Sequence, residues 1–305
     1  MLSNTSNTSN TSDAAAVPAV PAPPMRDHLD PTQHREWGRS RRKACPRTIQ
    51  SLWEMTDARD PVEILQRQEE HRLPFLVPVR HARMLTSPFA FYRGSAAVMS
   101  ADLATTPSTG IQAQLCGDAH LSNFGLFGSP ERALVFDCND FDETHPGPWE
   151  WDVKRLAVSA VLMVADRGWD TDAQRRLARA VGFGYRVSMA DFASNGRLAV
   201  WYSKVTDEQL LALAKDDNRA AIEKQFRKAR LNDVGRAIAK YTEVVDGRRR
   251  FVHQPPLVMR LDDSMSADAA AAMHQNVIGL FGEYLESVPD YLRVLLGGYE
   301  LIDVA

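Results

Sequence analysis

The stretch CGDAHLSNFGLFGSPERALVFDCNDFDE, at residues 116–143, decides the local fold and holds the most informative side chains of this chain. It opens with Asp118 and Asn123, passes the turn residues Gly128-Ser129-Pro130, and continues into an apolar run at residues 133–136. A turn followed by a short apolar run predicts a β-hairpin that brings the chain back on itself. The run leads into a cluster of acids, Asp137, Asp140, Asp142 and Glu143. We therefore expect these acids to lie near the loop that contains Asp118.

These residue types suit phosphoryl transfer, which needs a carboxylate that orients the acceptor and oxygen ligands for Mg²⁺. Asp118 fits the first role. The amide oxygen of Asn123 and the carboxylate of a later aspartate fit the second, because Mg²⁺ prefers hard oxygen donors and few protein ligands. The alternative is a polar turn in which Asp and Asn side chains bond their own backbone. That alternative explains any single acid more easily than it explains the whole ordered set.

Several longer motifs resemble known families. GDAHLSN (117–123), NDFDE (139–143) and PWEWDVKRLA (148–157) resemble the aminoglycoside and choline kinase-like pattern, in which a GDxHxxN loop precedes an acid motif and a helix. A closer resemblance is to the uncharacterised bacterial family DUF2252, from about Trp37 to the C-terminus. It rests on SPFAFYRGSA (87–96), QLCGDAHLSNFG (114–125), VFDCNDFDET (135–144) and GPWEWDVKRLA (147–157).

The kinase-like resemblance implies an α+β fold with a protein-kinase-like catalytic lobe, mostly helical, around a small β-hairpin catalytic region. It implies Mg²⁺ and ATP as cofactors and Asp118 as the catalytic residue. The acceptor, a small molecule or a protein, is left unknown by the sequence. Cys116 and Gly117 stand where protein kinases have a histidine and an arginine, although glycine before the aspartate is usual in the small-molecule kinases.

The metal-binding acid has more than one interpretation. A hairpin as short as that of typical kinases favours Asp137, whereas counting back from Asp152 favours Asp140. The motif DFDE, in which Phe141 follows the acid as an apolar anchor, makes Asp140 the preferred metal ligand beside Asn123. Asp142 and Asp137 complete the set of predicted metal ligands.

A helix is predicted to begin around Asp152, because apolar residues follow from Val153 at helical spacing. Asp152 could be the N-cap of this helix. In the kinases that it resembles, an aspartate at this position braces the catalytic loop, and Asp152 and Arg155 would then support the site from behind. Both interpretations of Asp152 stay open.

Arg93 and His120 each have two interpretations as well. Arg93 follows aromatic residues, so it could pack on a ring or pair with a core acid, or its guanidinium could bind a phosphate of the nucleotide or the acceptor. His120 could act as an acid or base beside Asp118, or it could fix the loop by a hydrogen bond, which we favour.

One expected part of a nucleotide site is missing from the sequence. No G-x-G-x-x-G loop and no V-A-I-K-like strand occurs in the 305 residues. The DUF2252 resemblance implies that longer members continue past the point that matches residues 302–304 into a Gly-rich segment and a lysine-bearing strand. We therefore expect a chain that lacks its nucleotide-covering lobe and, alone, binds ATP weakly.

Three other functions are compatible with the same residues. One is AMP transfer on the same fold, with the nucleotide turned around. Another is a non-catalytic, pseudokinase-like binding protein that keeps the acids for structure. A metal-dependent hydrolase on a different fold could also use Asp118, His120, Asn123 and Asp140, although the ordered match that extends to Asp152 and Arg155 argues against it.

Composition sets the broad class. A net charge of −3 gives no reason to expect nucleic-acid binding. No segment reaches the roughly 20 apolar residues of a membrane span. Three cysteines without CxxC spacing favour a reducing cytoplasm. The Ser-Asn-Thr repeats and Pro-interrupted alanines near the N-terminus predict a disordered tail over residues 1–33. The resemblance to DUF2252 implies one DUF2252-like domain over residues 34–305.

Outside residues 116–143, which we call the central stretch, the sequence mostly predicts a helical scaffold. Asp60-Pro61 is typical of a helix start, and the chain after Pro74 looks irregular. Residues 171–192 read as one helix, and 265–296 as two further helices. Asp246-Gly247 predicts a hairpin turn.

Overall fold

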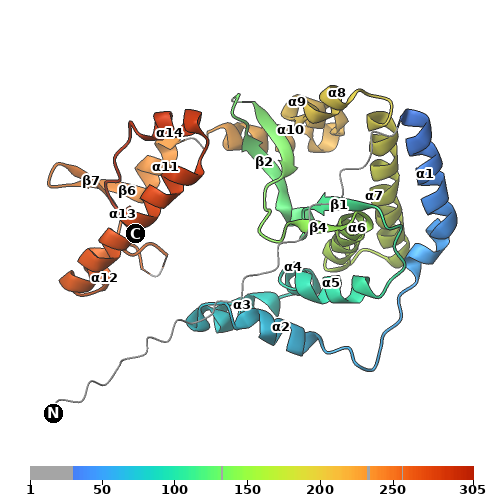
Figure 1. Cartoon of the computed structure of the whole chain (residues 1–305), viewed down its shortest axis with the longest axis horizontal. Coiled ribbons are helices and arrows are strands. Elements are labelled where there is room, and N and C mark those ends of the chain that lie inside the picture. Colours follow the sequence, from blue (N-terminus) through green and yellow to red (C-terminus); the bar gives the residue numbers. More distant parts are fainter. Residues whose placement is uncertain (1–29, 132, 232–233, 256) are drawn as a thin grey trace, which may run out of the picture. The chain divides into compact units, whose positions relative to one another are not determined.

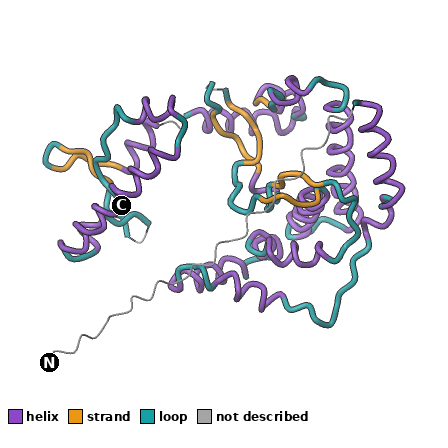
Figure 2. The backbone as a smooth tube through the Cα atoms, in the orientation of Figure 1, coloured by secondary structure: helices purple, strands orange, loops and turns teal. Residues whose placement is uncertain are grey.

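A computed structural model describes residues 30–131, 133–231, 234–255 and 257–305. The expected α+β architecture is confirmed, since helices dominate and the strands form small antiparallel sheets (Figures 1 and 2). The chain divides into two compact units. The first comprises the described residues up to Leu121 together with Asp140–Ser188, and the second comprises Ser122–Asn139 and Met189–Ala305.

The first unit begins with helix α1 (Pro31–Ala44). Asp30 is its N-cap and forms a capping box with Gln33, which satisfies amides that the first turn leaves without partners. Of the disordered tail predicted over residues 1–33, residues 1–29 lie outside the described residues. The last part of that prediction, from Pro31, is wrong, because these residues form the first turn of α1.

The chain from Pro46 to Ala104 is more helical than its prolines suggest. Helix α2 (Pro61–Glu69) starts as predicted, with Asp60 as N-cap. After Pro74, short helices replace the irregular chain that we expected, because each proline occupies a first-turn position where no backbone N–H is needed. The remaining elements are η1 (Arg47–Ser51), η2 (Pro74–Leu76), α3 (Val77–Met84), α4 (Pro88–Arg93) and α5 (Ala96–Ala104).

A two-stranded sheet, one long helix and most of a second long helix complete the first unit. Strand β1 (Gln112–Leu115) pairs antiparallel with β4 (His145–Pro148), so the segments on either side of the central stretch lie side by side. Helix α6 (Glu150–Ala165) follows at once, and its Ala160 and Val164 are buried in the core. Helix α7 (Thr171–Phe192) has the bounds that the sequence predicted.

The second unit contains the predicted hairpin. Strand β2 (Phe124–Gly128) pairs antiparallel with β3 (Leu134–Cys138), and β5 (Val205–Thr206) adds to the free edge of β3. Val135 and Cys138 are buried on this sheet. The helices that follow along the chain are α8 (Arg197–Trp201), α9 (Asp207–Leu213), α10 (Asp216–Arg230) and α11 (Val234–Tyr241).

A second hairpin lies further along the same unit, between β6 (Thr242–Val245) and β7 (Arg248–Phe251). Its turn at Asp246 and Gly247 is confirmed, and both residues have positive φ, of 49° and 75°. This is the backbone twist that suits a two-residue hairpin turn. Helices α12 (Leu261–Ser264), α13 (Ala267–Ser287) and α14 (Asp290–Leu296) follow, so the two helices predicted between 265 and 296 are confirmed as α13 and α14.

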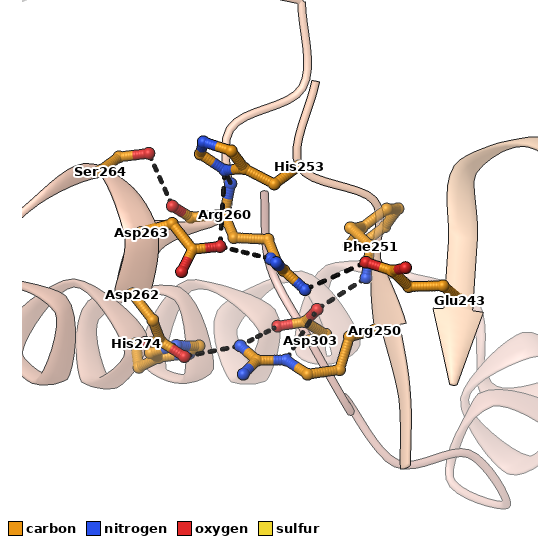
Figure 3. Close-up of polar contacts among 10 residues, drawn as sticks. All are labelled: Glu243, Arg250, Phe251, His253, Arg260, Asp262, Asp263, Ser264, His274 and Asp303. Carbon is orange, nitrogen blue, oxygen red and sulfur yellow. Dashed lines mark hydrogen bonds and ion pairs between the residues drawn. The ribbon is translucent and has the colours of Figure 1, made fainter. Parts of the chain in front are cut away.

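Ion pairs connect this second hairpin with the segments that follow it. Figure 3 shows Arg250 on β7 between the carboxylates of Asp262 and Asp303, at 2.6 and 3.2 Å. A second arginine, Arg260, binds Asp263 at 2.6 Å and Glu243 of β6 at 3.3 Å. Asp303 also accepts the backbone N–H of Phe251 at 2.8 Å. The residues near the C-terminus are thereby fixed to β7.

No helix among the described residues combines the length and the apolar character needed to cross a lipid bilayer. The three cysteines, all of which lie within the described residues, form no disulfide.

Candidate functional site

Charged side chains of both signs surround a small cavity of about 150 Å³ in the first unit. Its acids are Asp118, Asp140, Asp142 and Glu143, and its bases are Arg72, Arg80 and Arg93. We call this the acid–arginine cavity. The acids come from the two ends of the central stretch, and the arginines come from the helical segment between α2 and α5. Four of the residues predicted for the site therefore line one cavity: Asp118, Asp140, Asp142 and Arg93.

Asp118 is held in place by Arg155 of α6. The Arg155 Nε donates to Asp118 Oδ1 at 2.5 Å, and the Arg155 side chain is only 3% exposed. The rest of the guanidinium is also engaged, because Nη2 donates to the Tyr92 carbonyl at 2.8 Å and the group lies 4.2 Å from the centre of the Tyr92 ring. A carboxylate that is paired in this way is fixed in direction.

Asp152 holds the backbone of the same loop. Its two carboxylate oxygens accept the amides of Cys116 at 2.7 Å and Gly117 at 3.2 Å. The alternative role as N-cap is wrong, because α6 begins at Glu150 and Trp149 is its N-cap. These two hydrogen bonds favour the interpretation in which Asp152 braces the Asp118 loop.

Ser159, which the sequence analysis missed, adds a third contact from α6. Its Oγ accepts the Leu121 amide at 3.1 Å and is fully buried. Asp152, Arg155 and Ser159 are spaced three and four residues apart, so they lie on one face of the helix. The signal was present in the sequence as polar residues at helical spacing within a mostly apolar helix.

Gly117 allows the loop to approach the acid motif closely. Its φ is +84°, and a Cβ at this position would lie 1.8 Å from the carbonyl oxygen of Glu143. Only glycine fits such a conformation and such a contact without strain. The loop of Asp118 and the segment of Asp140 to Glu143 are therefore adjacent because residue 117 has no side chain.

Asp140 and Asp142 interact with each other. The hydrogen bond that Asp140 donates to Asp142, with a smaller contribution from burial, raises the pKa of Asp140, while the same hydrogen bond lowers the pKa of Asp142. Two carboxylates this close compete for one proton, since both cannot be ionised without repulsion. Mg²⁺ removes such repulsion when it binds, and it uses one or two carboxylates together with water. The pair therefore fits the cation that the sequence resemblance implies.

The arginines of the cavity include two that sequence reasoning missed, Arg72 and Arg80. Arg80 donates to the Gly94 carbonyl, and burial together with the nearby charge of Arg72 lowers the pKa of Arg80. The Nε of Arg72 is buried and has no hydrogen-bond partner among the described residues. Neither residue belongs to a recognisable motif, because tertiary contacts alone bring the segment from Arg72 to Arg93 to the Asp118 loop.

His120 is buried, with 3% of its surface exposed, and it does not line the cavity. Its backbone N–H donates to the Asp118 carbonyl at 2.8 Å, and its Nε2 lies 3.4 Å from Asp118 Oδ2. Burial lowers the pKa of His120, against the raising effect of Asp118. The ring also contacts the Phe89 ring edge to face. This environment favours a loop-fixing role over acid–base chemistry.

Asn123 and Asp137 belong to the second unit. Asn123 is buried and ends the short helix η3 (Leu121–Asn123), and its carbonyl accepts the Asn139 amide at 2.9 Å, which closes the hairpin. Asp137 is exposed on β3, and its side chain accepts the amide of Cys138 at 2.7 Å. Asp137 thus makes the local backbone bond that the turn interpretation expected of an aspartate.

The family can now be established from the sequence profile that the chain matches. The profile of the family described as "Uncharacterized protein conserved in bacteria (DUF2252)" matches residues 72–305, well over half of the chain. This chain belongs to DUF2252. The DUF2252 match begins at Arg72 and includes every residue of the acid–arginine cavity and the helix α6 that braces it. No curated protein and no solved structure matches the chain.

Within the residues that the structure describes, no three His, Cys, Asp or Glu side chains are placed to share one metal ion.

Proposed function

We propose that this DUF2252 protein is a kinase-like phosphotransferase that uses ATP and Mg²⁺. The observation that carries the proposal is the acid–arginine cavity, which is lined by Asp118, held by Arg155, together with the Asp140–Asp142 pair and three arginines. Positioning and electrostatic stabilisation supply most of the catalysis in phosphoryl transfer, so a preorganised set of charges is the feature to expect.

Asp118 would orient the acceptor group. Its Oδ1 is committed to Arg155, and the carboxylate lines the cavity. Because Arg155, Asp152 and Ser159 all come from α6, the loop cannot turn away from the cavity without breaking several hydrogen bonds at once. This arrangement resembles the support that catalytic residues need from neighbouring side chains.

Asp140, with Asp142, would hold Mg²⁺, which would supply charge neutralisation for the transferred group. The roles of Asn123 and Asp137 as metal ligands stay predictions from the sequence resemblance. The three arginines would bind an anionic group of the nucleotide or the acceptor, because guanidinium groups match phosphate and carboxylate in charge and geometry. Arg72, with a buried Nε that lacks a partner, is the arginine best placed to gain from an anion.

The first experiment measures cation binding. Mn²⁺, used as a paramagnetic stand-in for Mg²⁺, is titrated into the full chain, Asp140→Asn and the control Asp172→Asn, which changes an exposed aspartate on α7. We expect Asp140→Asn to weaken binding at least tenfold and the control to have no effect. Unchanged Mn²⁺ affinity in Asp140→Asn, with lower stability, would show that the acids serve structure instead.

A second experiment identifies the transferred group. The chain is incubated with Mg²⁺ and a high concentration of ATP labelled on either the α- or the γ-phosphate, because we expect ATP binding to be weak. The label on protein and small-molecule fractions is then followed. We expect transfer of γ-label only, and loss of transfer in Asp118→Asn. Transfer of the α-label would instead establish AMP transfer.

A further inference from the structure

A second and larger hollow lies in the first unit. It has a volume of about 580 Å³, within the range of about 300–1,000 Å³ that is usual for small-molecule sites. The segment of η1, helices α4 and α5, and one face of α6 form its walls. We call it the apolar groove. Its lining shares no residue with the acid–arginine cavity.

The walls of the groove are mostly apolar and aromatic. The large apolar side chains of the lining include Leu52, Trp53, Phe91, Val98, Val158 and Leu162. Several of them remain open to solvent, with Leu52 54% and Trp53 46% exposed. A grouped set of exposed large apolar side chains around a concave surface is typical of a binding site, because covering them with an apolar ligand is favourable.

The few polar groups in the groove determine what kind of ligand fits. Arg59 and Asp102 neutralise each other through two hydrogen bonds of 2.6 and 2.9 Å. The remaining charge is Lys154, which has no hydrogen bond or ion pair with any described residue. Burial lowers the pKa of Lys154, against the raising effects of Cys45 and of the buried Glu150, whose carboxylate accepts hydrogen bonds from Thr109. The groove therefore carries one positive charge that forms no direct ion pair with a described residue.

Gln50 provides a second unsatisfied group in the lining. Its Nε2 donates to Cys45 Sγ at 2.9 Å, whereas its Oε1 is buried without a hydrogen-bond partner. A buried acceptor without a partner is unfavourable and indicates a place for a donor group or a water molecule. Together, Lys154 and Gln50 give an otherwise apolar groove two polar contact points.

We propose that the apolar groove binds a small amphiphile, with an apolar body against Trp53, Val158 and Leu162 and one anionic group paired with Lys154. The ligand class follows from apolar walls and a single unpaired cation, since a neutral hydrocarbon would leave Lys154 unpaired and a cation would be repelled by it. This inference goes beyond phosphoryl transfer and does not depend on it.

The groove shares structural parts with the support of Asp118. Lys154, Val158 and Leu162 repeat every four residues and form one face of α6, while Asp152, Arg155 and Ser159 form another. Tyr92 and Met99 also line the groove, and both contact the Arg155 guanidinium, Met99 through its sulfur at 3.7 Å. A bound amphiphile would thus pack against two of the residues that hold Arg155.

The test is calorimetric titration of the full chain with decanoate, and with 1-decanol and decylammonium as neutral and cationic probes of the same chain length. We expect decanoate to bind at least tenfold more tightly than 1-decanol, because only the carboxylate can pair with Lys154. Lys154→Met should remove this preference, while Lys43→Met, at an exposed lysine of α1, should keep it.

The position of the site is tested by filling it. Val158→Trp places a large ring in the groove and should weaken decanoate binding at least tenfold, while Val187→Trp, at a similarly exposed valine on α7, should leave it unchanged. Circular dichroism checks that each variant folds. Two outcomes would overturn the proposal: equal binding of decanoate and 1-decanol that Lys154→Met does not change, or decanoate affinity that Val158→Trp does not alter.

Discussion

Arg155 shows how one buried side chain can fix several neighbouring groups at once. Its guanidinium contacts Asp118, the Tyr92 carbonyl, the Tyr92 ring and Met99, so nearly every part of the side chain has a partner. Burial raises the pKa of Tyr92, whose hydroxyl donates to the Arg155 carbonyl at 3.1 Å. Tyr92 therefore stays neutral and acts as a hydrogen-bond donor at any physiological pH.

The ion pair predicts a thermodynamic cycle. Arg155→Met should lower the free energy of unfolding by about 3 kcal/mol, because it leaves the carboxylate of Asp118 largely buried without its partner. The double variant Arg155→Met with Asp118→Asn should recover part of this loss, since no unpaired charge remains. Urea unfolding of the two single variants and the double variant measures the coupling. A double variant that is no more stable than Arg155→Met would contradict the assigned pairing.

At the scale of elements, α6 and α7 show different uses of a long helix. Helix α6 presents a polar face to the Asp118 loop and an apolar face to the groove. Helix α7, in contrast, has no buried residue among its 22 positions, and it contains Gly182 and Gly184 at exposed sites. Glycine in a helix interior loses more conformational freedom on folding than alanine does.

This difference makes α7 a place where stability can be raised. Gly182→Ala should raise the free energy of unfolding by about 0.5–1 kcal/mol, because the site is helical and nothing lies within 4 Å of the added Cβ. Gly168→Ala is the matched comparison. Its surroundings are equally open, but its φ of +77° strains any residue with a side chain, so stability should fall. Thermal denaturation followed by circular dichroism measures both, and the same sign for both changes would refute the backbone argument.

At the scale of the whole molecule, residues that are far apart in the sequence lie in contact in the folded chain. In the second unit, Asp303 near the C-terminus is bound to Arg250 and to the Phe251 amide of β7 (Figure 3). Burial opposes the ionisation of Asp303, yet the hydrogen bonds from Arg250 and from the Phe251 and Val304 amides outweigh it and lower the pKa of Asp303. The carboxylate of Asp303 is therefore ionised in the folded protein at neutral pH.

The lowered pKa fixes the sign of the pH dependence. Asp303 stabilises the folded state above the unfolded pKa of about 4, and this contribution is lost as the pH falls through the lower folded pKa. Asp303→Asn should reduce stability by about 2 kcal/mol at pH 7, and the difference from the wild type should shrink towards pH 3. Urea titrations at several pH values test this, and a difference that does not change with pH would contradict it.

The sequence by itself determined the local structure and the family. The hairpin at residues 124–138, the helix at 171–192 and the turn at Asp246-Gly247 all follow from periodicity and turn chemistry, which act over a few residues. The motifs around Asp118 and Asp152 identified DUF2252, which the profile match confirms. The prediction of irregular chain after Pro74 was wrong, because a proline that ends one segment can also occupy the first turn of the next helix.

Only the tertiary structure decided which side chains meet. Arg72 and Arg80 carry no motif, and they join Asp118 in one cavity because packed helices bring distant segments together. The choice between cap and brace for Asp152 likewise depended on where α6 begins and on which amides its carboxylate reaches. The apolar groove is formed by segments more than a hundred residues apart, from Gln50 to Leu162, so no short-range pattern could reveal it. Local propensities act between near neighbours along the chain, whereas burial and charge pairing depend on distance in space.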